Sequence, residues 1–487
     1  MNAPLKRVAV ACLVLFGLLL LNINYRQVVK AADYRDNDRN SRVLVRSYER
    51  ERGSIALAGP GRTVVARSVK TDGRLEYLRT YPLADVYAHV TGYYSLIYGQ
   101  DGIEETQDRV LSGEDPRLFV ERFTDQLTGR EARGGDVVLT LQPAAQQAAY
   151  DGLKGKRGAV VALDPTTGAV LAMASSPSYD PGQLSSFDPA AIRAYRKQLT
   201  ADGAGDPLLN RAIAQTYPPG STFKVITAAA ALQAGRTPET RIPSPTTLLL
   251  PQTTRPLPNF GGESCGDGST STLADALRIS CNTAFAQLGL DLGQDAVREQ
   301  ARAFGFGDAG LRVPERVAPS VFPTGLDGAA LGQSAIGQRD VRVTPLQMAM
   351  VAAGIANQGR VMEPFVVREI QAPDLSRVEL AQPKTYREAV PRMVADELTG
   401  MMEAVVDNGT GTSAQIPGVR VAGKTGTAQN APGAAPHAWF IGFAPAQDPK
   451  VAVAVIVENG GNVGSEATGG RVAAPIARAV MQAVLGG

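Results

Sequence analysis

The sequence predicts an α+β fold in which a mostly antiparallel sheet, covered by helices, is combined with a separate helical lobe. Strand-like residues gather in two places that lie far apart in the chain, at about 158–174 and again at 419–457. Between them, the segment from about 185 to 410 carries mostly helix and loop signals. An amphipathic stretch from about Arg471 to Leu485 predicts a closing helix. Strands, a helical insertion, more strands and a final helix are the order of an α+β domain rather than of repeated βα units.

The 487 residues are enough for two or three domains, and we expect three parts. Residues 1–25 are predicted to hold a cytoplasmic tail and a transmembrane anchor, residues 26–155 a linker and a small mixed domain, and residues 156–487 the main domain. The formal net charge is only +2 without long blocks of one sign, which gives no support for a nucleic-acid partner. The two histidines, His89 and His437, leave almost no material for a Ser-His-Asp triad or a histidine-rich metal site.

The N-terminus contains an unbroken apolar run from Val8 to Leu21, which with its flanks approaches the ~20 residues of a spanning helix. An uncleaved anchor is favoured over a cleaved signal peptide, because no small-x-small cleavage site follows the run closely. Lys6 and Arg7 indicate that the N-terminus stays in the cytoplasm and that everything after about residue 25 lies outside. Basic residues on the other flank leave this charge rule ambiguous; they are Arg26, Lys30, Arg35 and Arg39.

The segment from 26 to 155 begins with polar and charged residues typical of a linker or a helical stalk. The residues on both sides of Gly59-Pro60-Gly61 predict a β-hairpin around that turn. Asp136–Leu141 alternates as a strand does, and Gln142–Leu153 has a helical pattern. The segment shows no constellation of catalytic residues, so we expect a pedestal that holds the next domain away from the membrane.

Residues 156–487 begin with a strong hairpin signal, two apolar stretches within 158–174 joined by a turn at Pro165–Gly168. Their continuous apolar character predicts a sheet covered on at least one face. Leu273–Gly289 predicts one or two short helices, and Thr344–Gly354 predicts an apolar helix begun by Thr-Pro. Three late strands are predicted, at Val419–Thr427, Ala438–Phe443 and Val451–Val457.

The stretch Tyr217–Lys224 contains the only S-x-x-K of the chain, where a Pro-Pro-Gly turn leads into a helix predicted from Thr222 and ended by Gly235. At the start of this helix the Ser221 N–H has no intrahelical partner, and the helix dipole favours developing negative charge. Lys224 lies three residues on, on the same face. Burial in an apolar helix would lower its pKa, so that it can act as the base that activates the serine. The alternative is a serine N-cap followed by an inert surface lysine.

Two further short motifs follow, Ser280-x-Asn282 in the loop between two predicted helices and Lys424-Thr425-Gly426 on a predicted strand. Each motif alone is weak evidence, since S-x-N is common in loops and K-T-G is more often an exposed strand end. The three together, on a helix start, an inter-helix loop and a strand, are the signature of serine acyltransferases that act on D-alanyl peptides and β-lactams.

On these residues the chain resembles the class B penicillin-binding proteins, the monofunctional transpeptidases, and most closely their short actinobacterial PbpA-like group. The resemblance covers nearly the whole chain and implies a transpeptidase domain of serine β-lactamase-like fold. A bifunctional class A enzyme is disfavoured, because the region before the catalytic part is too short for a glycosyltransferase. Besides the segments already named, the matching ones are Arg52–Ile55, Gly99–Glu104, Gly337-Gln338 and Gly423–Thr427.

The resemblance implies that Ser221 attacks the carbonyl of the penultimate D-alanine of a peptidoglycan stem peptide, with neutral Lys224 as its base. Ser280 would hydrogen-bond Lys224 and relay a proton to the leaving D-alanine. Asn282 would bind the substrate amide and position Lys224. The backbone N–H groups of Ser221 and Thr427 would form the oxyanion hole. An amine of a neighbouring stem would then take the acyl group and complete a cross-link.

The resemblance also implies that the stem peptide binds beside Lys424–Thr427 as an added strand. Lys424 and the hydroxyls of Thr425 and Thr427 would receive its terminal carboxylate, and Gly426 would let the peptide approach the backbone. No metal or organic cofactor is needed. β-Lactams would acylate the same serine, and membrane-bound proteins of cell-wall synthesis or division are the expected partners. The expected location is the cell membrane, with one span and an extracytoplasmic catalytic domain.

Other functions share parts of this pattern. A β-lactamase has the same motifs, but the helical lobe shows no well-placed glutamate to activate a deacylating water, and the anchor argues against it. A D,D-carboxypeptidase would use water as the acceptor, and the sequence separates it poorly from a transpeptidase. A β-lactam sensor would need further spanning helices, and an inactive cell-wall scaffold would be expected to have lost Ser221 or Lys224.

Three cysteines remain to be placed. Cys12 lies inside the apolar run and is expected to face lipid. Cys265 and Cys281 lie in the part expected to be exported, where disulfides persist, and a bridge between them is favoured over two free buried thiols. Because Cys281 is the middle residue of the S-x-N motif, such a bridge would tie the glycine-rich loop at 261–270 to the site and stiffen its wall.

Overall fold

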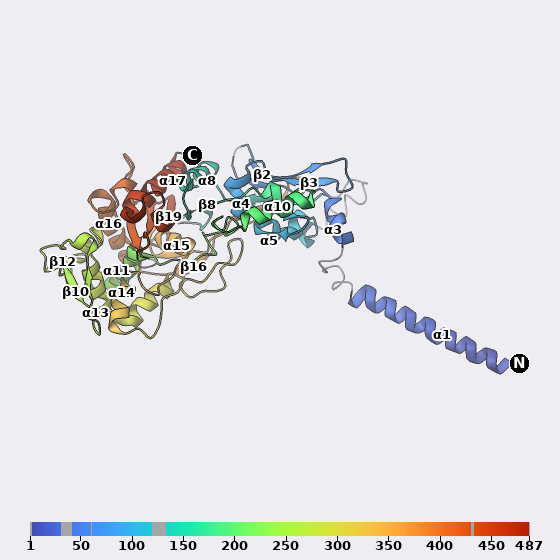
Figure 1. Ribbon diagram of the computed structural model, residues 1–487, viewed down its shortest axis with the longest axis horizontal. Coiled ribbons are helices and arrows are strands. Elements are labelled where there is room, and N and C mark those ends of the chain that lie inside the picture. Colours follow the sequence, from blue (N-terminus) through green and yellow to red (C-terminus); the bar gives the residue numbers. More distant parts are fainter. Residues whose placement is uncertain (1, 31–40, 60, 119–132, 430–432, 487) are drawn as a thin grey trace.

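The computed structural model describes residues 2–30, 41–59, 61–118, 133–429 and 433–486. Three residues named above, Arg35, Arg39 and Pro60, lie outside these ranges. Figure 1 shows an elongated body from one end of which the N-terminal helix extends.

The predicted anchor corresponds to α1 (Asn2–Asn24), which continues as a π-helical turn, η1 (Tyr25–Val29). Within the described part of the chain, this is the one helix that is long and apolar enough to cross a membrane. Its large apolar side chains are exposed, as expected for a segment whose solvent is lipid. The next described helix is α3 (Ser41–Tyr48), so the region after the anchor contains a helix, one of the two alternatives predicted for it.

A six-stranded sheet organises the N-terminal half of the body. In spatial order its strands are β15 (Arg377–Leu380), β14 (Val367–Gln371), β6 (Asp136–Leu139), β1 (Ile55–Leu57), β2 (Val64–Lys70) and β3 (Tyr77–Thr80). β1 pairs antiparallel with β2, which confirms the hairpin predicted around residue 60, and parallel with β6. β14 pairs antiparallel with β6 and opposes Val367 to Leu139. Two strands from late in the chain therefore complete a sheet that begins near residue 55.

A five-stranded sheet, antiparallel throughout, forms the core of the C-terminal half. In spatial order its strands are β17 (Ala422–Ala428), β18 (His437–Ala444), β19 (Val451–Val457), β7 (Gly158–Leu163) and β8 (Val170–Ser176). All five were predicted within a few residues of these bounds, including the hairpin that β7 forms with β8. The strand that carries Lys424-Thr425-Gly426 lies at the edge of the sheet, so one side of its backbone has no strand neighbour.

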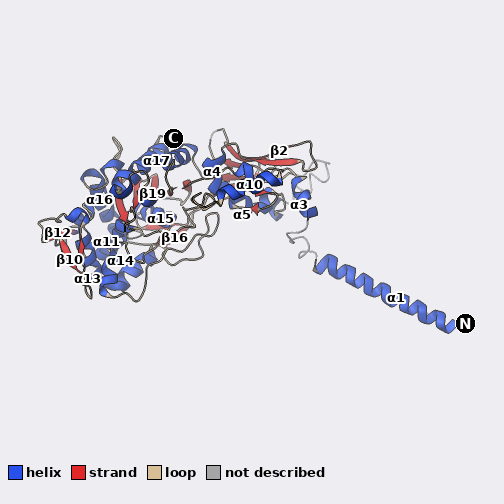
Figure 2. Ribbon diagram, viewed as in Figure 1, coloured by secondary structure: helices blue, strands red, loops and turns tan. Residues whose placement is uncertain are grey.

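Helices cover both faces of this sheet (Figure 2). One face packs against α8 (Pro143–Leu153) and α17 (Ala474–Leu485), and the other against α11 (Lys224–Gln233) and α15 (Pro345–Ala356). Successive residues of β7 belong to opposite cores, since Val160 lies with α8 and α17 and Val161 with α11 and α15. Burial on both faces explains why these strands read as continuous apolar runs. The fold class predicted from the sequence is thus confirmed.

The region from 185 to 410 is less helical than predicted, because it also holds eight short strands. Its main helices match the prediction: α12 (Leu273–Arg278) and α13 (Asn282–Ala303) flank the S-x-N motif, and α14 (Gly328–Ala335), α15 and α16 (Arg392–Asn408) follow. Besides β14 and β15, the unpredicted strands form three two-stranded pieces. These are β9 (Arg241–Pro243) with β12 (Thr270–Thr272), β10 (Thr247–Leu249) with β11 (Pro256–Pro258), and β13 (Arg360–Met362) with β16 (Thr385–Glu388).

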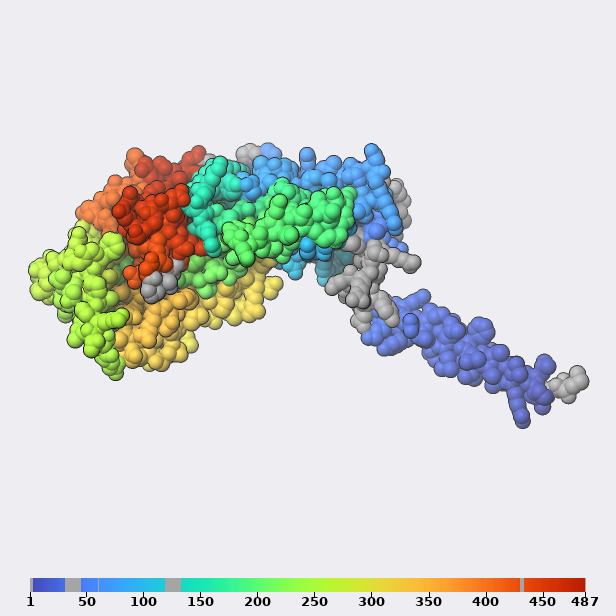
Figure 3. Space-filling model, viewed as in Figure 1, coloured from blue at the N-terminus to red at the C-terminus, as the bar shows by residue number. Residues whose placement is uncertain are grey.

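The two halves share elements across the predicted boundary at 155/156. Residues from both sides of it form one small apolar core, in which Ala88 and Tyr93 pack with Ile192 and Leu199. Figure 3 shows the green segment that carries α10 (Pro189–Leu199) lying along the blue N-terminal half. In the other direction, α8 precedes the boundary yet packs on the C-terminal sheet. The division into 1–25, 26–155 and 156–487 stays a prediction.

A buried cluster of charges lies beside the N-terminal sheet. Arg52 Nε donates to Glu104 Oε2 at 2.7 Å, and Arg79 Nε donates to Glu104 Oε1 at 2.6 Å. Arg52 also pairs with Asp108 at 2.5 Å, and Arg79 donates to Gly53 O at 2.7 Å. Burial alone would raise the pKa of Glu104, but Arg79 and Arg52 outweigh it and hold the pKa below its usual value. Every charge in this cluster thus faces an opposite one.

Candidate active site

Ser221 lies on a single 3₁₀ turn, η3 (Gly220–Phe223), which leads directly into α11. The α-helix begins at Lys224 rather than at Thr222 as predicted, and the serine lies at its N-terminal end. Two prolines directly precede the turn. Thr222 Oγ1 donates to Pro219 O at 2.8 Å, so the Pro219 carbonyl has a side-chain hydrogen-bond partner within the turn. Ser221 is partly exposed, whereas its neighbours Gly220 and Thr222 are buried.

Gly220 is required where this turn meets β17. Its φ is +53°, a left-handed conformation that glycine adopts without strain. A Cβ at this position would lie 2.8 Å from Thr427 O and 3.0 Å from the Cβ of Ala428. Gly220 N–H donates to Gly337 O at 2.9 Å, so a second segment from the sequence pattern, Gly337-Gln338, fixes the turn from the other side. Gln338 Nε2 donates to Thr427 O at 3.4 Å.

Lys224 is fully buried at the start of α11. Its Nζ lies 2.7 Å from Ser280 O, 2.7 Å from Asn282 Oδ1 and 3.4 Å from Ser280 Oγ. Burial, and then the nearby charge of Lys424, lower its pKa well below the usual value. In the described part of the chain no carboxylate pairs with this lysine, and no hydrogen bond joins it to Ser221 Oγ. An amine in these surroundings favours its neutral form, which is the form a general base needs.

Lys424 is the second buried lysine of the site. Its Nζ donates to Ser280 Oγ at 2.9 Å and to Thr425 O at 2.9 Å. Burial lowers its pKa to about 7. Ser280 therefore lies between the two lysines and can accept from either. Its φ of +63° is rare for a non-glycine residue, and it turns both the Ser280 carbonyl and hydroxyl toward the lysines.

The structure gives a reason for Gly426 that the sequence did not show. A Cβ there would lie 2.9 Å from Pro219 O, 2.9 Å from Thr222 Cγ2 and 3.0 Å from the Cβ of Trp439. It would point into the turn that carries Ser221. The glycine is needed so that the strand and the nucleophile's turn can approach each other. Trp439 Nε1 holds the same turn by donating to Pro218 O at 3.0 Å.

Thr425 has a partner that sequence reasoning missed. Its Oγ1 lies 2.6 Å from Oγ1 of Thr410, which follows α16, and the Thr425 side chain is buried. Thr427 is more exposed and lies opposite Ala438 in the register of β17 with β18. No local pattern marked Thr410, because its contact with β17 depends on the tertiary fold alone.

Cys265 and Cys281 are joined by a disulfide, with Cα atoms 6.1 Å apart. The bridge ties the loop before β12 to the N-terminus of α13, next to Ser280 and Asn282. The third cysteine, Cys12, is exposed on α1. Among the motif residues, the structure brings Ser280 and Asn282 to Lys224 and Ser280 also to Lys424, while Ser221 lies on the turn directly before Lys224.

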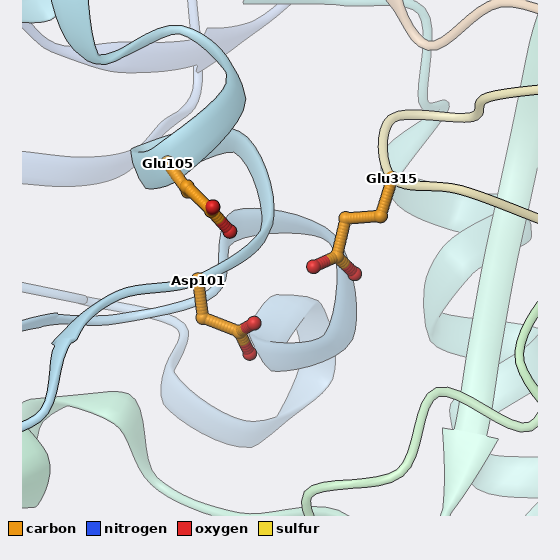
Figure 4. A group of neighbouring side chains, drawn as sticks. All are labelled: Asp101, Glu105 and Glu315. Atoms are coloured by element: carbon orange, nitrogen blue, oxygen red, sulfur yellow. The ribbon is translucent and has the colours of Figure 1, made fainter.

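One cluster of carboxylates has spacing that a metal ion would accept, and it lies elsewhere. Ligand oxygens of Asp101, Glu105 and Glu315 lie within 4.8 Å of one another. Figure 4 shows Glu105 on α5 (Gly102–Thr106), Asp101 just before that helix, and Glu315 on a separate loop with its side chain pointing toward them. Burial and the neighbouring Glu315 raise the pKa of Asp101 to about 7. The cluster joins the two halves of the body far from α11 (Figure 1) and takes no part in the site.

The chain matches known families and proteins over nearly all of its length. The penicillin binding protein transpeptidase domain matches residues 158–482, and the penicillin binding protein A dimerisation domain matches residues 52–137. The peptidoglycan D,D-transpeptidase PbpA of Mycolicibacterium smegmatis is 50% identical, over 100% of this chain and 99% of that protein. The PbpA of Mycobacterium tuberculosis is 48% identical, over 100% of both chains. A solved structure of M. tuberculosis penicillin-binding protein A, an imipenem acyl-enzyme complex, superposes with a TM-score of 0.86 at 47% identity, covering 91% of this chain and 100% of that one.

Proposed function

We propose that this chain, which belongs to the class B penicillin-binding proteins of the actinobacterial PbpA group, is a peptidoglycan D,D-transpeptidase that acts through an acyl-enzyme at Ser221. The burial of Lys224 is the observation that supports the assignment of Ser221 as the nucleophile and Lys224 as its base. A lysine buried without a carboxylate, directly after the turn that bears a partly exposed serine, has the character of a base. β-Lactams form the corresponding covalent adduct with such enzymes, as they do in the structural relative.

In this reaction Ser221 Oγ attacks the carbonyl carbon of the penultimate D-alanine, and Lys224 accepts the hydroxyl proton. The carbon–nitrogen bond to the terminal D-alanine then breaks. Ser280, which is within reach of both lysines, passes a proton to the departing amine. An amine from a neighbouring stem peptide attacks the ester, and the proton it loses returns along the same groups to Ser221 as the cross-link forms.

The donor peptide binds along the free edge of β17. An edge strand offers unpaired backbone groups, so that an extended peptide can add to it as a further strand. Lys424 lies on this strand and in its protonated form can attract the terminal carboxylate, and the partly exposed Thr427 can donate its hydroxyl to it. Thr425 acts with Thr410, since the two hydroxyls already share a hydrogen bond. The N–H groups of Ser221 and Thr427 form the oxyanion hole, where one lost donor costs about 10²–10³ in rate.

The test is the intact mass of the full chain in detergent micelles after incubation with benzylpenicillin, beside the Ser221→Ala variant. We expect a stable adduct on the wild type and none on the variant. A rapidly lost adduct, with the drug consumed, would instead indicate a β-lactamase. A stem-peptide substrate then separates the remaining alternative: an added amine acceptor should be joined to the donor by a transpeptidase, whereas a D,D-carboxypeptidase releases only D-alanine and hydrolysed donor. A folded protein that forms no adduct would favour the scaffold.

We further propose that α1 anchors the chain with its catalytic half outside the cytoplasm and that membrane-bound proteins of cell-wall synthesis or division are its partners. The long apolar helix and the disulfide, which persists in oxidising compartments, support this orientation. Protease added to intact spheroplasts should then digest the catalytic half, and survival of that half while outside controls are cut would refute the orientation. For the partners, in-cell cross-linking from the N-terminal half should recover the same membrane proteins from independent positions.

A further inference from the structure

Asn259 is a buried polar residue that none of the motifs includes, yet it contacts the S-x-N motif directly. Its side chain is 6% exposed. Oδ1 accepts from the backbone N–H groups of both Asn282 and Thr283, each at 3.0 Å. Nδ2 donates to Glu263 O at 3.1 Å and to Pro245 O at 3.4 Å, which fixes the amide from behind. Every polar atom of this side chain is thus used.

The two N–H groups that Asn259 accepts from are the first of α13, which lack intrahelical partners. A helix usually satisfies them with a polar side chain at its own N-cap. Here the N-cap is Cys281, whose sulfur is committed to the disulfide and makes no cap. Asn259 replaces the missing cap from a distant loop, and it thereby fixes the backbone position of Asn282.

The residue before Asn259 fixes the side chain of Asn282 as well. Asn282 Nδ2 donates to Pro258 O at 3.2 Å, while its Oδ1 accepts from Lys224 Nζ at 2.7 Å. A carbonyl oxygen can only accept, so the Pro258 carbonyl determines which end of the Asn282 amide faces the lysine. The pair Pro258-Asn259 therefore sets both the place and the orientation of this amide.

This orientation matters for the base. A neutral amine has two N–H donors and one lone pair, and Lys224 has two close partners, Ser280 O and Asn282 Oδ1, that can only accept. These two bonds use both donors, so the lone pair is left to take a proton from a hydroxyl of the site, with Ser280 Oγ 3.4 Å from Nζ. If the Asn282 amide were reversed, its N–H would face the lone pair and block it.

We propose that Asn259 is a positioning residue for Lys224, which holds Asn282 so that the lysine lone pair stays free; the proposal rests on the function proposed above. Asn259 touches no reacting atom and acts through Asn282. The loop that carries it is the one the disulfide ties down, so the bridge and Asn259 hold the same segment at two points.

The experiment uses the full chain in detergent micelles and the variants Asn259→Ala and Asn259→Asp. The matched control is Asn210→Ala, because Asn210 is also buried, accepts from a backbone N–H and donates to a backbone carbonyl, but outside the site. Acylation by benzylpenicillin is followed from pH 5 to 10 and separated into the binding constant and the acylation rate constant. The midpoint of Lys224 titration is measured independently by NMR on ε-¹³C-lysine protein, with Lys224→Ala assigning the signal among the ten lysines.

For Asn259→Ala we expect the maximal acylation rate constant to fall by about 10- to 100-fold, with the binding constant little changed. The Lys224 midpoint should move to lower pH, because the ammonium form loses an acceptor. Asn259→Asp keeps the accepting oxygen but replaces the Nδ2 donor with an oxygen that faces Glu263 O and Pro245 O, so it should recover only part of the rate. Asn210→Ala should lose thermal stability with a wild-type rate and midpoint.

An Asn259→Ala protein that loses stability but keeps the wild-type rate and Lys224 midpoint would overturn the proposal. If that variant does not fold, Asn259→Gln, which moves the oxygen by one methylene, should show the same loss of rate, and a wild-type rate there would overturn it equally. Absence of a Ser221 adduct on the wild type would refute the proposed function instead. The NMR midpoint would still decide the role of Asn259, since an unshifted Lys224 overturns it and a shifted one supports it.

Discussion

Two of the buried clusters of charged side chains in the described part of the chain are built in opposite ways. Beside the N-terminal sheet, Arg52 and Arg79 share the carboxylate of Glu104 in short ion pairs. In the active site, Lys224 and Lys424 face each other's charge, and in the described part of the chain their hydrogen-bond partners are carbonyl, amide and hydroxyl oxygens. The first cluster holds its groups in their charged forms, whereas the second favours loss of a proton.

The difference separates buried charges that stabilise the fold from buried amines that can transfer protons in the reaction. A compensated buried ion is costly to disturb and does not titrate near neutral pH, so it can fix a fold but cannot move protons. An uncompensated buried lysine is itself unfavourable to fold around, but its pKa is shifted toward the pH at which the reaction occurs. Three substitutions test whether the first cluster stabilises the fold and the second supplies the base for acylation.

The largest effect is expected for Lys224→Met. Without the base, acylation by benzylpenicillin should fall by about 10²–10⁴, while thermal stability should not fall, because methionine fills the same space without a desolvated amine. Stopped-flow acylation and calorimetry measure the two quantities. A variant that acylates at more than a tenth of the wild-type rate would place the base elsewhere.

Glu104→Gln should produce the reverse outcome. It leaves the buried Arg79 without a countercharge and Arg52 with Asp108 alone, which costs about 3–5 kcal/mol of unfolding free energy, with the acylation rate per folded molecule unchanged. The folded pKa of Glu104 lies below its unfolded value, so its contribution is present above pH ~4.3 and is lost as the pH falls through the folded pKa. Denaturant unfolding of both proteins between pH 3 and 7 checks this, and parallel curves with no offset would contradict it.

Lys424→Met is expected to have the smallest effect of the three, a shift in pH dependence. Removing the neighbouring cation should raise the Lys224 pKa, so that the acylation rate reaches its plateau at higher pH. The pKa of Lys424 is about 7 in the folded chain and ~10.4 unfolded, so the unfolded chain binds more protons between these values and stability rises with pH there. The variant should show less of this rise. An unmoved acylation midpoint would mean that the two amines are not coupled.

The sequence predicted those parts whose signals are local. The hairpin of β7 and β8 follows from two apolar runs and a Pro-Thr-Thr-Gly turn, and the start of α15 from Thr344-Pro345. The three motifs were correctly placed on a helix start, a loop and a strand. What escaped prediction depends on contacts between distant segments. Thr410 and Asn259 act on residues 15 and 23 positions away, and nothing in their own neighbourhoods marks them.

Other features escaped because one residue type serves several purposes. The left-handed conformation of Ser280 has no sequence signal, since serine rarely adopts it. Gly426 was identified as a position that needs glycine, but the sequence did not show that the turn of Ser221 approaches it. β14 was missed because Val367–Gln371 contains only two apolar residues and becomes a strand by pairing with β6.

That pairing has a consequence for how the chain folds. Val367 meets Leu139 only after about 230 intervening residues have been made, and β6 is already paired with β1 on its other side. During synthesis, the N-terminal sheet therefore keeps one open edge until the whole region that contains Ser221 has been made. Contacts of such long sequence separation form late and slowly. The N-terminal sheet and the region that contains Ser221 are thus completed together, and a chain stopped before residue 367 leaves both unfinished.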